Sequence, residues 1–245
     1  MDCVDFAAAL DLLEERLAGP GPGCAVIAVN PEKMVRAQRD PALLASLKRA
    51  GLLIPDGIGV VLALRLLGLG RTRRVPGCEL MPRICALAER TGHGVFLFGA
   101  SPEINARAAA VLSQRFPRLR ITGCRDGYVS EEETDGVLAA IEASGARVLF
   151  VALGSPRQEL WMARHLPRLT GVRICQGVGG TFDVLAGAVK RAPAGFIRLN
   201  AEWLYRLLTQ PSRILRQTAL PRFAWQVLTA RLSVLPQTHP RGPAK

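Results

Sequence analysis

The sequence predicts an α/β fold, namely a Rossmann-like parallel sheet with helices on both faces, followed by a basic helical appendage at the C-terminus. Short apolar runs rich in β-branched residues recur, and a helical stretch follows each one, which is typical of a parallel sheet covered on both faces. Strand-like runs stop after Pro193. Residues 190–245 hold 10 basic and 1 acidic side chains and the preceding 189 residues hold 22 and 19, so the excess positive charge is also C-terminal.

Each element of this fold rests on a local pattern. Strands are expected at Cys24–Val29, Leu52–Ile54, Val95–Phe98, Arg120–Thr122, Val148–Leu153 and Val172–Cys175. Helices are expected over Pro31–Ala50 and Gly57–Leu67. Two more should begin at Ser101–Pro102 and Ser155–Pro156, because serine can cap a helix and proline suits its first position.

The change of texture after Pro193 predicts a domain boundary near residue 192. Residues 1–192 would form the α/β domain, 193–235 an amphipathic basic appendage, and 236–245 a flexible proline-rich tail. Within the appendage, amphipathic helices are expected over Phe196–Leu208 and Arg213–Leu235, separated at Pro211. The net charge of +9 over residues 190–245 predicts a polyanionic partner: nucleic acid, an anionic membrane surface or a phosphorylated substrate.

Composition and motifs exclude several classes of protein. Apolar residues make up 49% of the 245, which supports a sizeable core. The six cysteines form no Cys-x-x-Cys pair, so we expect no zinc site and reduced thiols, several of them buried. We see no signal peptide at the N-terminus, and the most apolar stretch, Gly57–Gly70, is only 14 residues long and contains Arg65. That is too short to span a bilayer, so a soluble or peripheral protein is expected.

Ligands of open α/β sheets bind beyond the carboxyl ends of the strands, so the residues that follow the predicted strands are candidates for a site. They are glycines, small hydroxyls, amides and single carboxylates: Asn30, Asp56, Gly57, Gly99–Ser101, Asp126–Tyr128, Gly154–Glu159 and Gly177–Asp183. Glycine lets backbone N–H groups approach a phosphate, and helix N-termini favour anions. The ring therefore predicts a nucleotide diphosphate ligand, with ordinary strand-to-helix turns as the alternative.

The standard nucleotide motifs are missing. There is no GxxxxGK[ST], which argues against a P-loop ATPase, and Gly177–Phe182 lacks the third glycine of the dinucleotide fingerprint. Without an Asp-x-Asp pair, a metal held to the diphosphate is not supported, and we expect no metal and no cofactor. Arginines and backbone donors would then have to meet the phosphate charge.

Single charged residues leave alternatives open at this stage. Asp56 follows a predicted strand, where a carboxylate in a cleft can accept a proton from an attacking hydroxyl. It could equally cap the helix predicted over Gly57–Leu67. Arg74 follows a basic run and is expected to be a solvated loop charge, and Asp183 could cap a turn. The three histidines show no metal spacing, and none is given a catalytic role.

Taken together, the motifs resemble those of the WecG/TagA/CpsF glycosyltransferases, glycosyltransferase family 26. The matching segments are Pro55–Gly59, Arg74–Gly77, Gly127–Tyr128, Gly154–Glu159, Gly177–Asp183, Lys190–Pro193 and Glu202–Arg206. They occur in one order between about Val26 and Arg216, and no single one of them is as specific as the combination. Within the family the chain is most similar to the enterobacterial common antigen branch, the UDP-N-acetylmannosaminuronic acid transferases.

The resemblance implies transfer of an N-acetylmannosamine-type sugar from a UDP-sugar donor to a GlcNAc carried on undecaprenyl diphosphate, with inversion and no evident metal. It implies that Asp56 is the base, that Arg74 binds the diphosphate and that Gln158 is the catalytic amide. Three appendage arginines are implied at the diphosphate as well: Arg206, Arg213 and Arg216. The expected donor-binding residues are Asn30, Gly57, Gly99, Tyr128, Gly154, Ser155, Glu159, Gly179, Gly180, Thr181 and Asp183.

The chain also departs from the family pattern. Ala28 stands where some members have threonine, which favours a UDP-N-acetylmannosaminuronate donor over UDP-N-acetylmannosamine, and Ala100 replaces a glycine. Another UDP-hexose such as UDP-glucose, or a non-catalytic membrane-associated scaffold, remains an alternative. A nucleic-acid-binding module is disfavoured, because the chain has few aromatics and no such motif. We expect a cytoplasmic protein, peripheral on the anionic inner face of the cytoplasmic membrane, with a polyprenyl-diphosphate-linked sugar as acceptor and a possible homo-oligomeric state.

Overall fold

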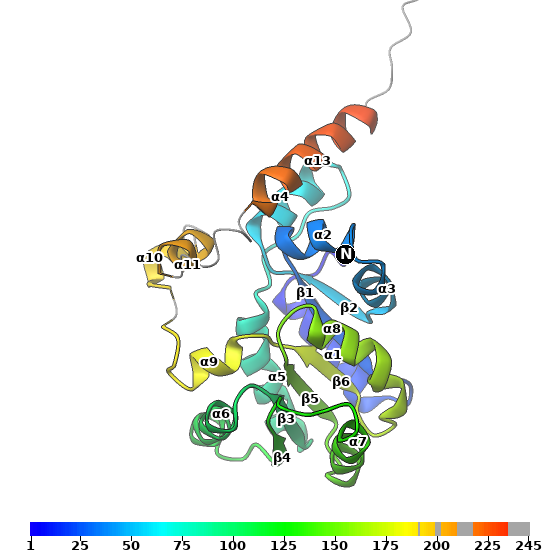
Figure 1. The fold of residues 1–245 in the computed structure, drawn as a ribbon, viewed down its shortest axis with the longest axis vertical. Coiled ribbons are helices and arrows are strands. Elements are labelled where there is room, and N and C mark those ends of the chain that lie inside the picture. Colours follow the sequence, from blue (N-terminus) through cyan, green and yellow to red (C-terminus); the bar gives the residue numbers. More distant parts are fainter. Residues whose placement is uncertain (191, 199–201, 210–217, 235–245) are drawn as a thin grey trace, which may run out of the picture.

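The computed structural model describes residues 1–190, 192–198, 202–209 and 218–234, and these form an α/β structure around a six-stranded sheet (Figure 1). The strands are β1 (Cys24–Val29), β2 (Leu52–Pro55), β3 (Val95–Gly99), β4 (Ile121–Arg125), β5 (Val148–Ala152) and β6 (Ile174–Gly177). Their order is β2-β1-β6-β5-β3-β4, and every pair is parallel. The predicted fold class is confirmed, and all six carboxyl ends therefore meet at one edge of the sheet.

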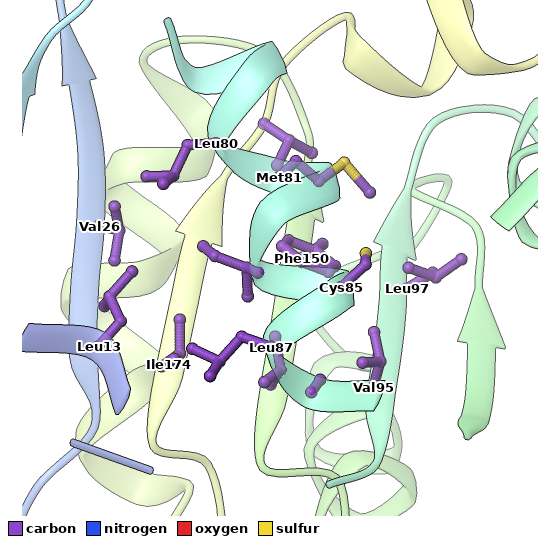
Figure 2. Packing of buried hydrophobic residues seen from close by; sticks show 14 of the residues in the cluster. Leu13, Val26, Leu80, Met81, Cys85, Leu87, Val95, Leu97, Phe150 and Ile174 are labelled. Atoms are coloured by element: carbon purple, nitrogen blue, oxygen red, sulfur yellow. The ribbon is translucent and has the colours of Figure 1, made fainter. Parts of the chain in front are cut away.

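Helices cover both faces of this sheet, as predicted. The buried residues of one face come from α1 (Phe6–Ala18), α5 (Gly77–Thr91), α6 (Pro102–Arg115) and α9 (Thr181–Leu185). Those of the other face come from α3 (Pro41–Arg49), α7 (Thr134–Ala143) and α8 (Arg157–His165), which continues into a 3-10 turn at Leu166–Arg168. Figure 2 shows α5 lying over the first face, its apolar side chains packed on those of the strands.

Two local expectations for helices were wrong. The helix predicted over Pro31–Ala50 is two helices, α2 (Pro31–Ala37) and α3. Pro41 disfavours helical backbone at Asp40, and the Asp40 carboxylate instead caps α3 by accepting the Leu43 N–H at 3.0 Å. At Ser155–Pro156 the serine does not cap: the helix begins at Arg157, with Pro156 in the N-cap position. At Ser101–Pro102 the expected cap is present.

After α9, the described residues of the C-terminal part form three helices. The range predicted as one helix over Phe196–Leu208 overlaps α10 (Ala194–Arg198) and α11 (Glu202–Thr209). The third, α13 (Ala219–Val234), packs on α2 and on α4 (Ile58–Leu66), where Phe223 and Val227 join the buried side chains of Val60 and Leu64 (Figure 1). The predicted tail over residues 236–245 lies outside the described residues.

Burial and helix length bear on two further expectations. Cys24, Cys85 and Cys175 are buried free thiols, and burial raises the pKa of Cys24 to about 11 and that of Cys85 to about 12. Cys3 and Cys124, by contrast, are exposed. Among the described helices, none combines the length and the apolar character needed to cross a membrane.

Candidate active site

The carboxyl ends of β1 and β2 lie side by side and carry the first part of the site. Val29 and Pro55 are partners in the parallel register, and the Asp56 N–H donates to the Val29 carbonyl at 3.0 Å. The segment before α5 runs along the same edge, because the Val75 N–H donates to the Pro55 carbonyl at 2.8 Å. Residues 74–77 are thereby held beside residues 55–56, although about 20 positions separate them in the chain.

Asp56 is half-buried and bound to the start of α5. Its Oδ1 atom accepts the N–H of Gly77, the first residue of that helix, at 3.1 Å. The N-terminus of a helix favours a negative charge, so this contact fixes the carboxylate at the edge of the sheet. The alternative in which Asp56 caps the following helix is wrong, since Gly57 is the N-cap of α4 and no side chain caps it.

Arg74 is not a solvated loop charge. Its Nη1 atom lies 3.6 Å from Oε2 of Glu202 in α11, and its side chain is only 14% exposed. The guanidinium therefore lies beside the first turn of α11. Of the three appendage arginines, Arg206 falls within α11, while Arg213 and Arg216 lie outside the described residues.

Gln158 and Glu159 begin a buried polar network at the start of α8. The Gln158 amide donates to Glu159 Oε1 at 3.0 Å, and its Oε1 accepts the Gly179 N–H at 3.0 Å. Lys33 Nζ donates to the same Glu159 oxygen at 2.6 Å and to the Ala28 carbonyl at 2.7 Å. This network joins the loops after β1, β5 and β6 at one point.

The family follows from comparison of the whole chain with known proteins. The model of the glycosyl transferase WecG/TagA/CpsF family matches residues 1–236. The chain belongs to this family. A 37% identical relative from Bacillus spizizenii, aligned over 219 residues that cover 88% of this chain and 83% of its own, is named N-acetylglucosaminyldiphosphoundecaprenol N-acetyl-beta-D-mannosaminyltransferase. The family inferred from the motifs is confirmed, and the protein is a glycosyltransferase.

The donor-binding residues predicted for this glycosyltransferase lie at different depths of the edge. Tyr128, Gly154, Ser155 and Gly180 are exposed; Asn30, Gly57, Gly179 and Asp183 are half-buried; Gly99, Glu159 and Thr181 are buried. Several of their polar atoms already have partners within the chain. Asn30 Oδ1 caps α2 by accepting the Lys33 N–H, and Thr181 Oγ1 donates to the Val178 carbonyl.

Position 99 requires glycine because of its backbone conformation and its close contact with β5. Its φ of +115° is one that L side chains rarely adopt, and an added Cβ would lie 2.5 Å from the Ala152 carbonyl oxygen. The next residue, Ala100, also has a positive φ of 60°. The glycine at position 99 is thus explained by the close approach of β3 to β5, without a ligand.

Three residues near the site were not given a role by the sequence. Lys33 and Glu202 pair with predicted site residues, and Gln176 in β6 donates from Nε2 to the Gly77 carbonyl at 3.0 Å. Gln176 thereby supports the residue that holds Asp56. The sequence signal that could have indicated these residues is a polar side chain within an apolar run. That signal is clear for Gln176 and weak for Lys33, which lies on a helix.

Two cavities lie beside the helices. One of about 530 Å³ is bordered by α2, the start of α3 and Arg222 of α13, and one of about 260 Å³ is bordered by Trp161 and His165 of α8. Neither is lined by Asp56 or Arg74. Within the described residues, no group of three or more His, Cys, Asp or Glu could hold a metal ion.

Proposed function

We propose that this protein transfers an N-acetylmannosamine-type sugar from a UDP donor to a GlcNAc carried on undecaprenyl diphosphate. The observation that carries the proposal is the placement of Asp56. The start of α5 holds its carboxylate at the carboxyl end of β2, and the neighbouring Pro55 accepts the N–H of Val75, the residue after Arg74. The name of the Bacillus spizizenii relative supports the same acceptor and an N-acetylmannosaminyl group.

In this proposal, transfer is a single displacement with inversion. The acceptor hydroxyl oxygen forms a bond to the anomeric carbon as the bond from that carbon to the UDP oxygen breaks. Asp56 accepts the hydroxyl proton, and UDP leaves with the electron pair of the broken bond. Arg74 and backbone N–H groups at this edge stabilise the charge that develops on the diphosphate, together with Arg206, Arg213 and Arg216.

The remaining predicted residues are assigned by their burial. Exposed and half-buried members of the edge, such as Tyr128, Ser155 and Asp183, are proposed to contact the donor. Glu159 is fully buried and paired with Lys33, so we assign it to holding Gln158 rather than to direct contact with the sugar. Gln158 in turn holds the Gly179 loop, which is the proposed contact of the donor diphosphate.

The sugar itself is the open part of the proposal. Ala28 favours the uronate donor, whereas the relative is named for the neutral mannosaminyl group. A panel of UDP-sugars, each incubated with polyprenyl-diphosphate GlcNAc and analysed by mass, separates the possibilities. Product from UDP-N-acetylmannosaminuronate or UDP-N-acetylmannosamine supports the proposal and names the donor. Product from UDP-glucose alone would replace the donor, and no product from any member would favour the scaffold alternative.

A membrane location is proposed from one apolar face. Large apolar side chains that are at least 49% exposed lie on α4, just after it and on the neighbouring α13: Leu62, Leu66, Leu69, Trp225 and Leu228. We call this set the α4–α13 apolar face. Exposed arginines accompany it at Arg65, Arg222 and Arg231. Apolar side chains interspersed with cations suit an anionic lipid surface, which would place the enzyme peripherally on the inner face of the cytoplasmic membrane, where its lipid-linked acceptor is anchored.

A further inference from the structure

Glu202 is the one carboxylate of the C-terminal charge excess. Residues 190–245 carry 10 basic side chains, and Glu202 is the only acidic residue among them. Its carboxylate faces Arg74 rather than solvent. Glu202 thus links the basic C-terminal part of the chain to Arg74, near the carboxyl end of β2. An ordinary surface charge makes no such link.

The burial of this pair separates it from the surface ion pairs of the protein. The Arg74 and Glu202 side chains are 14% and 11% exposed, whereas those of Arg90 and Glu14 are 63% and 46% exposed. Placing a charge away from water is unfavourable unless an opposite charge compensates. Removal of the Glu202 charge should therefore loosen the contact between α11 and the core, while removal of the Glu14 charge should have little effect.

The geometry leaves Arg74 able to bind an anion while it is paired. The 3.6 Å separation of Nη1 and Oε2 exceeds the 2.7–2.9 Å typical of a charge-assisted hydrogen bond. A guanidinium has five N–H donors, and one distant carboxylate oxygen does not saturate them. A diphosphate can share the guanidinium with Glu202, so substrate binding does not require the ion pair to break.

The helical repeat links Glu202 to a proposed diphosphate ligand. Position 206 follows position 202 by four residues in α11, and positions four apart lie on the same face of a helix. A contact that turns position 202 toward Arg74 therefore turns the face of α11 that carries position 206 in the same direction. Glu202 also lies in the first turn of α11, where a negative charge is favourable.

We propose that Glu202 is a positioning residue. Through its ion pair with Arg74 it docks α11 beside the carboxyl end of β2, and it thereby places position 206 at the donor diphosphate. The site assignment rests on the proposed function, but the docking itself does not. Glu202 has no bond to make or break in the transfer. Its effect on the reaction is indirect, through the placement of Arg74 and of the helix that carries Arg206.

Hydrogen exchange of the substrate-free full-length protein tests the docking. Glu202→Gln should increase exchange in peptides covering residues 202–209, and Arg74→Ala should do the same. Because both variants break the same ion pair, the double variant should exchange no faster than the faster single variant. Glu14→Gln, which removes the same charge from an exposed pair, is the matched control and should leave these peptides unchanged. Unaltered exchange in Glu202→Gln, or additive effects in the double variant, would overturn the proposal.

Kinetics then separate positioning from a general loss of fold. Glu202→Gln should raise both the donor KM and the Kd of UDP about tenfold, with a smaller change in kcat, because position 206 acts on the bound diphosphate. A fall in kcat with unchanged UDP binding would contradict the assignment to the diphosphate. If increased exchange accompanied an enzyme inactive with every donor, the docking would stand and the proposed function would fail.

Discussion

The Nζ atom of Lys33 lies 2.6 Å from Oε1 of Glu159, and both side chains are almost completely buried. Lys33 belongs to the helix after β1, whereas Glu159 belongs to the helix after β5. The same carboxylate oxygen accepts the Gln158 amide, which in turn holds the Gly179 N–H. One buried ion pair thus connects three loops of the candidate site.

Breaking this pair should be costly, whereas neutralising both partners should not be. Lys33→Met leaves the Glu159 carboxylate buried without its cation and is expected to lower the free energy of unfolding by about 3–5 kcal/mol. The double variant Lys33→Met/Glu159→Gln removes both charges and should recover most of that loss. Urea unfolding measures each value. Equal destabilisation of the single and double variants would contradict the argument, and Glu14→Gln at the exposed pair should cost less than about 1 kcal/mol.

Gly99→Ala should be more damaging than its position at the end of strand β3 suggests. The new Cβ would lie 2.5 Å from the Ala152 carbonyl oxygen, at a φ that alanine rarely adopts. Strain and overpacking together should cost roughly 2–4 kcal/mol. At the next position, Ala100→Gly relieves a positive φ. This variant should leave the free energy of unfolding unchanged or raise it by up to about 1 kcal/mol. Thermal unfolding of both variants tests the contrast, and equal effects would contradict it.

The strands and one helix break show how far the sequence predicts this fold. All six strands were expected within three residues of their observed bounds, because buried parallel strands form short apolar runs that stand out. The helix break at Asp40–Pro41 was missed, although Pro41 is a local signal. Strand order was not predicted, because it depends on packing between segments far apart in the chain.

The site was predicted as a set of loops but not as a set of contacts. Asp56 follows an obvious strand, so its place at the edge was foreseeable. Its partner Gly77 lies 21 positions away, and no local pattern pairs the two. The same holds for Lys33 with Glu159 and for Arg74 with Glu202. Long-range ion pairs require the tertiary structure, which is why Arg74 was expected to be a solvated charge.

His165 should make the protein sensitive to mild acid. Burial lowers its pKa below the usual 6.5, and Arg164 and Arg168 add to the effect. The unfolded chain then binds a proton more readily than the folded one, so this contribution to stability is complete above about pH 6.5 and is lost as the pH falls toward the folded-state pKa. His165→Phe keeps a ring against Trp161 and removes the titration. Urea unfolding at pH 7.5 and 5.5 should show a smaller pH dependence for the variant; identical dependence would exclude His165 as a source.

The α4–α13 apolar face should determine binding to lipid. The double variant Leu66→Gln/Trp225→Gln removes two large exposed apolar side chains and should weaken binding to vesicles containing anionic lipid by at least about tenfold. Leu44→Gln, at an exposed leucine of α3, is the control and should bind as the parent does. Vesicle sedimentation measures the binding, which should weaken with salt because the arginine contribution is screened. Unchanged sedimentation combined with loss of a dimer would identify the face as a contact between copies of this chain.

Asp56→Asn tests the proposed base most directly. Asparagine keeps an oxygen that can accept the Gly77 N–H, so the fold and the start of α5 should be preserved. The amide cannot take the proton of the acceptor hydroxyl, and kcat should fall by about 10²–10⁴-fold. Because the donor is bound by other groups, the Kd of UDP should change little. UDP release measured with the lipid-linked acceptor gives kcat, and calorimetry gives the Kd. Asp11→Asn, on the N-terminal helix α1, is the matched control and should retain activity. Turnover of Asp56→Asn within a few-fold of the parent would remove Asp56 as the base, and parallel loss of UDP binding would assign it to donor binding instead.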